Sequence, residues 1–311
     1  MKESTPGHGS EVERAGIYLA VVREYWKNTH TLYLENVGTT FQAGRIKVGP
    51  GEDPATGSNL YLATAAGIRP GHQVLDAGCG VCGPSIDIAR NIEGVRIAAI
   101  TISPEQAATA SELVRKAGLQ KRVELVVGDF HRLPFAASLF DLVCFFESSC
   151  YSYDLRLLFS EVRRVLRPGG HVYLKEVFRH DGPLSREERA DLGMFDRTFA
   201  TRTASMEEVA GALASNGFTE VQRRDLSGQI TTTHALEAMF TLRMGYLQPT
   251  EFGRLHFRIY HNLPILYGDM KATRSRLDEL QCQSLRRPGG NNRVRTYGRT
   301  WRPLDPELAV N

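Results

Sequence analysis

The sequence predicts an α/β fold, a sheet flanked by helices, and two observations lead to this prediction. First, an apolar run ends at Asp76 and is followed by Gly78, Gly80 and Gly83. Glycines there let a strand turn sharply into a helix and let a ligand lie directly on the main chain. Second, strand-like and helix-like segments alternate from this loop to about residue 225. That alternation is typical of a Rossmann-like sheet with helices on its faces.

The second predicted strand, residues 96–101, ends at Thr101 and not at an acid. A dinucleotide fold would have a ribose-binding acid about 20 residues after the glycine loop. Here SPEQ follows, with Ser103 suited to cap a helix, Pro104 to its first position and Gln106 to a capping box. Ser103 and Gln106 either only cap this helix or also contact a ligand.

The third predicted strand, residues 123–129, ends in Asp129 and is followed by Phe130. An acid and an aromatic ring at the carboxyl end of a strand suit the edge and face of an adenine. The alternative is that Asp129 caps the next turn.

In chain order, DAGCGxxG, TxSPEQ, GDF and RPGG resemble the class I S-adenosylmethionine (SAM) methyltransferases over residues 60–225. The resemblance implies their Rossmann-like sheet and SAM as cofactor. It places Asp76, Gly78 and Gly80 beside the methionine part, and Asp129 and Phe130 near the adenine. Thr101 and Gln106 would lie near the ribose, where the family usually has an acid. That departure is typical of carbon methyltransferases acting on sterols, fatty acyl chains and prenyl groups.

The fourth predicted strand, within DLVCFFESSCY, ends at Glu147 after five apolar residues. Open α/β sheets bind ligands at this end of their strands, and a carboxylate there is costly to bury without a partner or a task. Glu147 therefore either caps a loop, pairs with an arginine, or takes part in catalysis.

Methylation of a C=C bond explains why a carboxylate would be needed, because it leaves a tertiary carbocation. A carboxylate at about 4 Å stabilises a unit positive charge by ~4 kcal/mol at an effective dielectric constant of ~20. Each aromatic face adds roughly 0.5–2 kcal/mol. Phe145, Phe146, Tyr151 and Tyr153 surround Glu147 in the sequence, and we expect Phe146 and Tyr151 to line the substrate pocket.

The segment FFESSCYSYDLRLLFSEVRRVLRPGG resembles both sterol 24-C-methyltransferases and geranyl diphosphate C-methyltransferases. Glu147 matches the Glu of both motifs, so the resemblance implies that it is catalytic. The diphosphate enzymes place Asn residues before this Glu to organise a magnesium-bound diphosphate, whereas this chain has Phe145 and Phe146. We therefore predict no metal site unless the acceptor is a diphosphate held with Mg²⁺. Otherwise the acceptor is a finished terpenoid or a prenylated indole.

The sequence divides into three parts: an N-terminal helical cap with a SAM-covering loop (1–58), the SAM-binding body (59–228), and a C-terminal helical lid with a basic tail (229–311). Apolar residues at helical spacing predict a helix over 11–26, which covers the SAM site, packs on a second copy of the chain, or only covers its own core. Phe41 falls where relatives close a side chain over the cofactor. The pattern of residues 235–247 and 252–270 predicts helices, which are either buried or form a lid over the acceptor pocket. The arginines after residue 285 either hold a diphosphate or are solvated.

Composition argues against nucleic-acid binding, a membrane span and a zinc site. A net charge of +3 over 311 residues gives no reason to expect nucleic-acid binding, and no apolar run approaches the ~20 residues of a membrane span. Five cysteines, an odd number, suit a reducing compartment, and we expect a cytoplasmic protein. Cys79 and Cys82 lack the second pair of ligands that a zinc site needs.

The leading hypothesis is a SAM-dependent C-methyltransferase that acts on an isoprenoid C=C bond through a carbocation, in terpenoid or other natural-product biosynthesis. One alternative is O- or N-methylation of a small molecule, with Glu147 or a nearby His as general base. Another is a SAM-fold partner subunit without catalytic activity.

Overall fold

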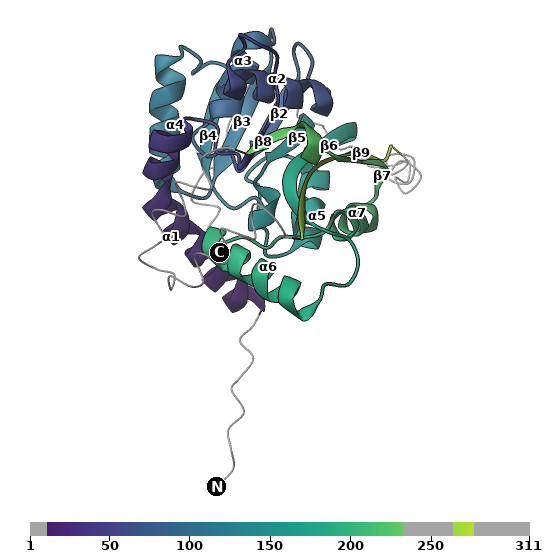
Figure 1. The fold of residues 1–311 in the computed structure, drawn as a ribbon. Helices are drawn as coiled ribbons and strands as arrows, with labels where there is room; N and C mark the ends of the chain where they lie inside the picture. The colour runs from purple at the N-terminus through teal and green to yellow at the C-terminus, as the bar shows by residue number, and fades with distance from the viewer. Residues whose placement is uncertain (1–10, 233–263, 277–311) are drawn as a thin grey trace, which may run out of the picture.

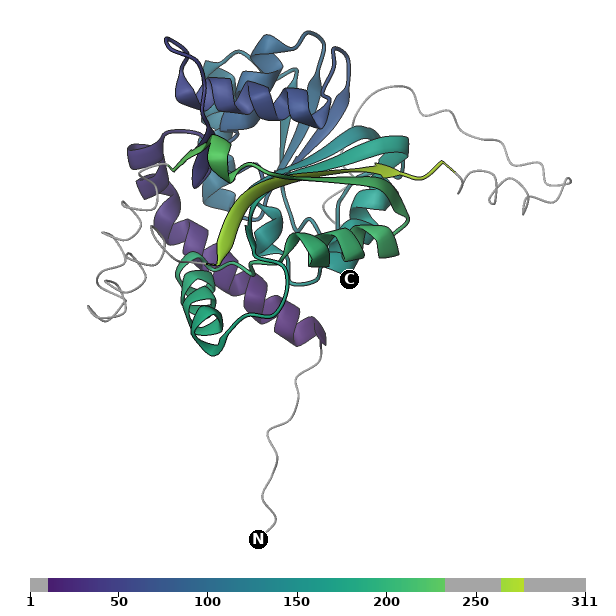
Figure 2. The same cartoon turned by 45° about the vertical axis from the view of Figure 1, so that its right-hand side comes forward.

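The protein is described by a computed structural model that covers residues 11–232 and 264–276. Within these residues, a seven-stranded sheet runs through the body in the order β4-β3-β2-β5-β6-β9-β7 (Figures 1 and 2). Its strands are β2 (Gln73–Ala77), β3 (Arg96–Thr101), β4 (Val123–Val127), β5 (Phe140–Phe146), β6 (Leu166–Arg179), β7 (Phe218–Asp225) and β9 (Ile265–Arg274). Strands β4, β3, β2, β5 and β6 run parallel to one another, and β9 is antiparallel to both β6 and β7. The predicted Rossmann-like fold is confirmed.

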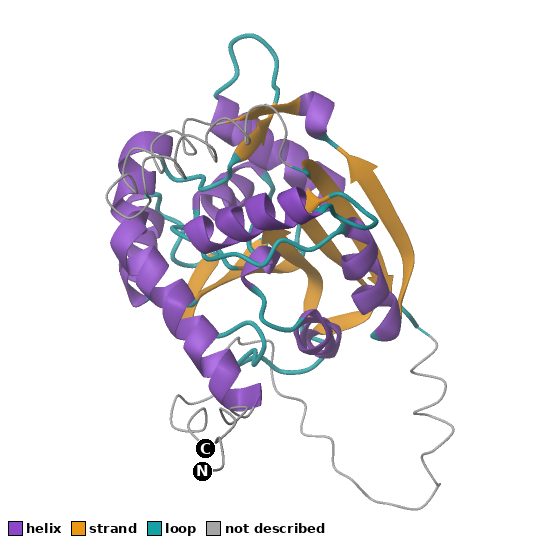
Figure 3. Cartoon of the chain, turned by 60° about the horizontal axis from the view of Figure 1, so that its bottom comes forward, coloured by secondary structure: helices purple, strands orange, loops and turns teal. Residues whose placement is uncertain are grey.

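Helices cover both faces of the sheet (Figure 3). They are α2 (Pro54–Ala66), α3 (Gly83–Asn91), α4 (Pro104–Lys116), α5 (Leu155–Val165) and α7 (Met206–Ser215). Alternate residues of β5 enter two different cores: Cys144 packs with α2, α3 and α4, and Phe145 packs with α5 and α7. Because both of its faces are buried, β5 is apolar without interruption from Leu142 to Phe146.

The strand and helix predicted around residue 101 form as expected. β3 ends at Thr101, and α4 begins at Pro104 with the Ser103 side chain accepting a hydrogen bond from the Gln106 backbone N–H. A proline at the first helical position loses no hydrogen bond. This junction brings Thr101 and Gln106 to the carboxyl edge of the sheet.

The N-terminal helix α1 (Glu11–Val37) is longer than the predicted 11–26 segment and ends before Gly38. It lies beside α6 (Arg186–Phe199) at one end of the molecule (Figure 2). The two helices share an apolar cluster whose buried members are Val22, Tyr25, Trp26, Tyr33, Met194, Phe195, Phe199 and Ala200. The same segment therefore covers its own core, one of the three roles considered for it.

The prediction of a helix over 252–270 is wrong from residue 265 onward, because these residues form β9. Long-range pairing with β6 and β7 determines the structure here, and it overrides the local apolar spacing. A Cβ on Gly268 would lie 2.9 Å from the Arg224 carbonyl oxygen, so glycine permits this close strand packing. The segment after 229 also starts with a strand, β8 (Ile230–Thr232), which pairs with β1 (Gly44–Ile46). The predicted helix over 235–247, the rest of 252–263 and the arginine-rich tail lie outside the described residues.

No helix within the described ranges is both long and apolar enough to cross a membrane.

Candidate active site

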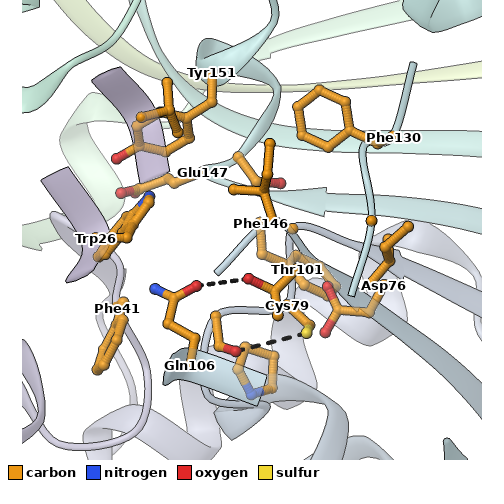
Figure 4. A pocket seen from close by; sticks show the side chains of 18 of the residues that line it. Trp26, Phe41, Asp76, Cys79, Thr101, Gln106, Phe130, Phe146, Glu147 and Tyr151 are labelled. Carbon is orange, nitrogen blue, oxygen red and sulfur yellow. Dashed lines mark hydrogen bonds between the residues drawn. The ribbon is translucent and has the colours of Figure 1, made fainter. Parts of the chain in front are cut away.

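A crevice opens at the carboxyl ends of the parallel strands, where β3 lies on one side of β2 and β5 on the other (Figure 4). In open α/β sheets this reversal of strand order is where ligands bind. All eleven residues predicted for the site line the crevice: Phe41, Asp76, Gly78, Gly80, Thr101, Gln106, Asp129, Phe130, Phe146, Glu147 and Tyr151. Residues predicted from four separate strands therefore meet in one cavity.

The glycine loop after β2 has the conformation that its sequence predicts. Gly78 has φ +88°, and its N–H donates to the Ile100 carbonyl at 2.8 Å. A Cβ on Gly78 would lie 2.4 Å from the Ser148 Cβ, so no other residue fits. Glycine is required at position 83 because the loop after α1 passes close by: an added Cβ would lie 2.2 Å from the Thr39 carbonyl oxygen.

Asp76 lies at the end of β2 with only 2% of its surface exposed. Its Oδ2 accepts a 2.6 Å hydrogen bond from the Ser85 hydroxyl. Burial raises the pKa of Asp76 to about 6, and the Ser85 hydrogen bond opposes this shift. The carboxyl group can therefore change its protonation state when a charged ligand enters.

Thr101 and Gln106 form the next wall. The Thr101 hydroxyl donates to the Gln106 Oε1 at 2.7 Å (Figure 4), so the glutamine side chain is not part of a capping box. Both residues are buried, and no described residue accepts a hydrogen bond from the Gln106 Nε2. A buried amide donor without a partner costs about 1–3 kcal/mol, which a ligand hydroxyl would offset. Gln106 lines the crevice, where the resemblance to SAM methyltransferases predicts the ribose.

Asp129 and Phe130 follow β4 and line the same crevice. Asp129 Oδ1 accepts from the His131 backbone N–H at 2.9 Å and lies 2.7 Å from the His131 Nδ1. Burial would raise the pKa of Asp129, but the hydrogen bonds and charge of His131 lower it overall. Asp129 therefore caps the turn that follows it, which was the alternative to ligand binding, and it also borders the crevice. Phe130 meets Phe145 edge-on with ring centres 5.8 Å apart.

Glu147 stands directly after β5 in a left-handed backbone conformation, with φ +59°. Its Oε2 accepts a hydrogen bond from the Ala43 N–H at 2.5 Å. Its Oε1 pairs with the ammonium group of Lys175, which also donates to the Gly44 carbonyl. Glu147 thus has a charged partner, a lysine from β6 where the sequence suggested an arginine.

A second cavity, which we call the aromatic chamber, adjoins the crevice and shares Trp26, Phe41, Glu147 and Tyr151 with it. Its other lining residues are Tyr33, Ala43, Cys150, Glu176, Val177, Phe195, Phe199, Thr201 and Thr203. Trp26 and Phe41 stack with ring centres 5.9 Å apart, and Tyr151 meets Trp26 edge-on at 5.6 Å. Figure 4 shows these three rings and Glu147 on one side of the crevice.

Two aromatic residues grouped with Glu147 in the sequence line neither the crevice nor the chamber. Phe145 is fully buried on the opposite face of the sheet. Tyr153 stacks on His131 with ring centres 3.8 Å apart. Phe146 lines the crevice but not the chamber.

Sequence reasoning missed Lys175 and Glu176, which lie side by side in β6. Glu176 Oε1 accepts three hydrogen bonds, from Ser148 N–H at 2.7 Å, from Ser149 N–H at 2.6 Å and from the Ser149 hydroxyl at 2.8 Å. Its Oε2 has no hydrogen-bond partner among the described residues. Burial raises the pKa of Glu176 to about 7, and the charge of Glu147 adds to this rise. The signal was present in the sequence as two charged residues inside the apolar run VYLKEVF.

Among the residues that the structure describes, no group of three or more His, Cys, Asp or Glu side chains could hold a metal ion.

Comparison with known proteins identifies the kind of domain. Residues 75–174 match the family described as "Methyltransferase domain". The sterol 24-C-methyltransferase ERG6B of Gibberella zeae is 31% identical over 221 residues, which are 69% of this chain and 57% of the relative. The chain thus spans a little over half the length of that relative.

Two solved structures share the fold. Geranyl diphosphate C-methyltransferase from Streptomyces coelicolor, in complex with Mg²⁺, geranyl diphosphate and S-adenosyl-L-homocysteine, has a TM-score of 0.64 and 21% identity, covering 86% of this chain and all of that one. A cyclase, SpnF, has a TM-score of 0.65 and 19% identity, covering 82% and 96%. By its domain match, its sequence relatives and its fold, the chain belongs to the class I SAM-dependent methyltransferases.

Proposed function

We propose that this protein is a SAM-dependent C-methyltransferase that methylates a C=C bond of an isoprenoid held in the aromatic chamber. The observation that carries the proposal is the wall of Trp26, Phe41, Glu147 and Tyr151 common to both cavities. An acceptor in the chamber would meet the cofactor crevice at this wall. Aromatic and apolar sides suit an alkene better than a polar nucleophile.

The crevice offers matching groups for SAM, which supplies an electrophilic methyl group on its sulfonium when bound. Gly78 and Gly80 expose main chain to the methionine part, beside the buried carboxyl group of Asp76. Thr101 and Gln106 would hold the ribose through the free amide donor, with Asp129 and Phe130 at the adenine.

The chain's own residues would then protect and stabilise a positive charge on the acceptor. The rings of Trp26, Phe41 and Tyr151 present faces and edges to the chamber, and each cation–π contact is worth roughly 0.5–2 kcal/mol. Glu147 contributes negative charge at the shared wall, reduced by its pairing with Lys175. Closely packed rings would also keep out the water that would trap a carbocation.

For the acceptor we propose a terpenoid or prenylated indole without a diphosphate. Phe145 and Phe146 occupy the positions where the diphosphate enzymes carry Asn, and Mg²⁺ belongs to the proposal only for a diphosphate acceptor. A homo-oligomer formed through α1 stays a prediction, for which Ile17 and Val21 offer exposed apolar side chains.

Mass spectrometry of reactions with SAM and two acceptors tests the proposal. One acceptor is geranyl diphosphate with Mg²⁺, and the other is a diphosphate-free prenylated indole. A gain of one CH₂ on the indole compound alone supports the proposed acceptor class, and a gain on the diphosphate alone replaces it with a prenyl diphosphate. NMR of the product then locates the new methyl group. A methyl on oxygen or nitrogen would overturn C-methylation in favour of the heteroatom alternative.

A further inference from the structure

The aromatic chamber contains a second carboxyl group besides Glu147. Glu176 is on β6, only 2% of its surface is exposed, and it lines the chamber together with Tyr33, Phe195 and Phe199. A buried carboxylate oxygen with no donor, such as its Oε2, is costly unless it has a task.

The two oxygens of Glu176 have different surroundings. Oε1 is anchored by the three donors of Ser148 and Ser149 at the start of a short 3-10 helix, Ser149–Tyr151. This anchoring fixes the direction of the carboxyl group and leaves Oε2 to exchange a proton. Glu147, in contrast, has partners on both oxygens, the Ala43 N–H on one and the Lys175 ammonium on the other.

We propose that Glu176, through its unpartnered Oε2, stabilises the carbocation formed on the acceptor and accepts the proton that it loses. Glu147 and Lys175 then act as a positioning pair that holds the loop at residues 43–44 against the chamber. This inference rests on the proposed C-methylation.

The chemistry balances without any further reactant. The alkene π pair forms a bond to the methyl carbon as the methyl–sulfur pair returns to sulfur, which leaves a tertiary cation. A C–H bond next to the cation then breaks, its electron pair forms a new C=C bond, and the proton moves to the Glu176 carboxylate. The products are a methylated alkene, the neutral thioether and a protonated Glu176, which returns its proton to solvent.

Three titratable groups share the chamber lining with Glu176: Glu147, which follows β5, Cys150 in the 3-10 helix, and Tyr33 from α1. Lys175 precedes Glu176 on β6 and extends from the other face of the strand to Glu147. Asp196 of α6 acts on Cys150. Burial raises the pKa of Cys150 well above its usual value, and the charges of Glu176 and Glu147 and a hydrogen bond to the Glu176 carboxyl group add to this rise, so the thiol stays neutral near pH 7. Burial also raises the pKa of Asp196, opposed by hydrogen bonds from Thr203 and Thr201.

The test measures binding of a stable cation that imitates the carbocation. N,N-dimethylisopentylamine carries a tertiary ammonium in place of the cationic carbon and, like a lysine amine, stays protonated below about pH 9. Its affinity for the S-adenosylhomocysteine-saturated protein is measured by calorimetry between pH 5.5 and 8.5. We expect binding to tighten at least fivefold as the pH rises, because Glu176 becomes a carboxylate. Near pH 6.5 it should release a proton, detected with buffers of different ionisation enthalpy.

Two matched variants assign this effect. In Glu176→Gln, the amide oxygen can still accept from Ser148 and Ser149, and we expect about tenfold weaker binding at pH 8.5 with no pH dependence. In Glu147→Gln, the pH dependence and proton release should persist. A flat profile in the wild type, or a profile lost only in Glu147→Gln, would overturn the assignment. Asp76 is the other buried carboxyl group that titrates near this pH. If Glu176→Gln fails to fold, proton release that persists in Asp76→Asn still assigns the proton to the chamber, and its loss there would overturn the assignment.

The outcomes separate the two proposals. If methylation of an alkene occurs and Glu176→Gln retains wild-type turnover, Glu176 is not the proton acceptor, although C-methylation stands. If the amine binds as expected but no alkene is methylated, the cation site stands and the proposed reaction fails.

Discussion

Lys175 and Glu147 form an ion pair inside the protein, with the lysine side chain fully buried and the glutamate side chain 8% exposed. The pair joins β6 to the end of β5 and, through the Gly44 carbonyl and the Ala43 N–H, to the loop that covers the crevice. The wall between the two cavities thus depends on a buried charge pair. Such a pair is sensitive to the loss of one partner, because the other charge is left unpaired in a medium of low dielectric constant.

Replacing Lys175 by methionine should therefore lower the free energy of unfolding by about 3–5 kcal/mol, the usual cost of leaving one buried charge unpaired. Urea unfolding monitored by tryptophan fluorescence measures this change. The double variant Lys175→Met/Glu147→Gln is the control and should recover at least half of the loss, since it removes both charges. A single-variant cost below about 1 kcal/mol would show that the pair is effectively solvated.

Glu147→Gln should retain affinity for S-adenosylhomocysteine within about threefold, because the residue meets the crevice only at the wall shared with the chamber. Turnover of the acceptor identified by mass spectrometry should fall at least tenfold, since the negative charge is lost and Lys175 is left without a charged partner. Calorimetry gives the affinity and product formation the turnover. Unchanged turnover would remove Glu147 from the mechanism.

Gly78→Ala should destabilise the fold and lower S-adenosylhomocysteine affinity at least tenfold. The new Cβ would lie 2.4 Å from Ser148, at a φ of +88° that side chains rarely adopt. Gly118→Ala is a matched control, because φ there is +70° and no atom lies within 4 Å of the added Cβ. It should cost only the backbone strain of about 1–2 kcal/mol and leave affinity unchanged. Equal effects of the two variants would mean that close packing at Gly78 is unimportant.

The parts of the fold with strong local signals could be predicted from the sequence. Strand β3 and helix α4 follow from an apolar run, a capping serine and Pro104. The meeting of Asp76, Thr101 and Asp129 follows from parallel strands, whose carboxyl ends share one edge. These residues could be located because each stands where a strand ends.

The remaining parts depend on contacts distant in sequence. Strand β9 is stabilised by pairing with β6 and β7, whose residues precede it by about 50–100 positions, so its local pattern favoured a helix. Lys175 and Glu176 lie inside a strand, and their partners Glu147 and Ser149 are visible only after β5 and β6 align. The chamber itself requires α1 and α6 to come together, which no local pattern indicates.

Gln106→Leu should weaken S-adenosylhomocysteine binding about tenfold, because it removes the buried amide donor proposed to hold the ribose. It also deprives the Thr101 hydroxyl of its acceptor. Ser103→Ala is the control: it removes the helix cap and a hydrogen bond to Glu105 but leaves the Gln106 amide in place. It should cost about 1 kcal/mol of stability, with affinity nearly unchanged. Calorimetry on both variants separates the two roles, and wild-type affinity in Gln106→Leu would contradict the ribose assignment.

Asp76 should make stability depend on pH in a direction opposite to that of most carboxylates. Burial raises its pKa in the folded protein to about 6, against about 3.9 in the unfolded chain. Its contribution to stability is therefore fully present below about pH 4 and is lost as the pH rises through 6, about 3 kcal/mol in total. In Asp76→Asn, the amide oxygen can still accept from Ser85 but cannot titrate. Urea unfolding of both proteins between pH 4 and 7.5 should show the wild type losing stability relative to the variant. A constant difference across this range would mean that Asp76 stays charged in the folded protein.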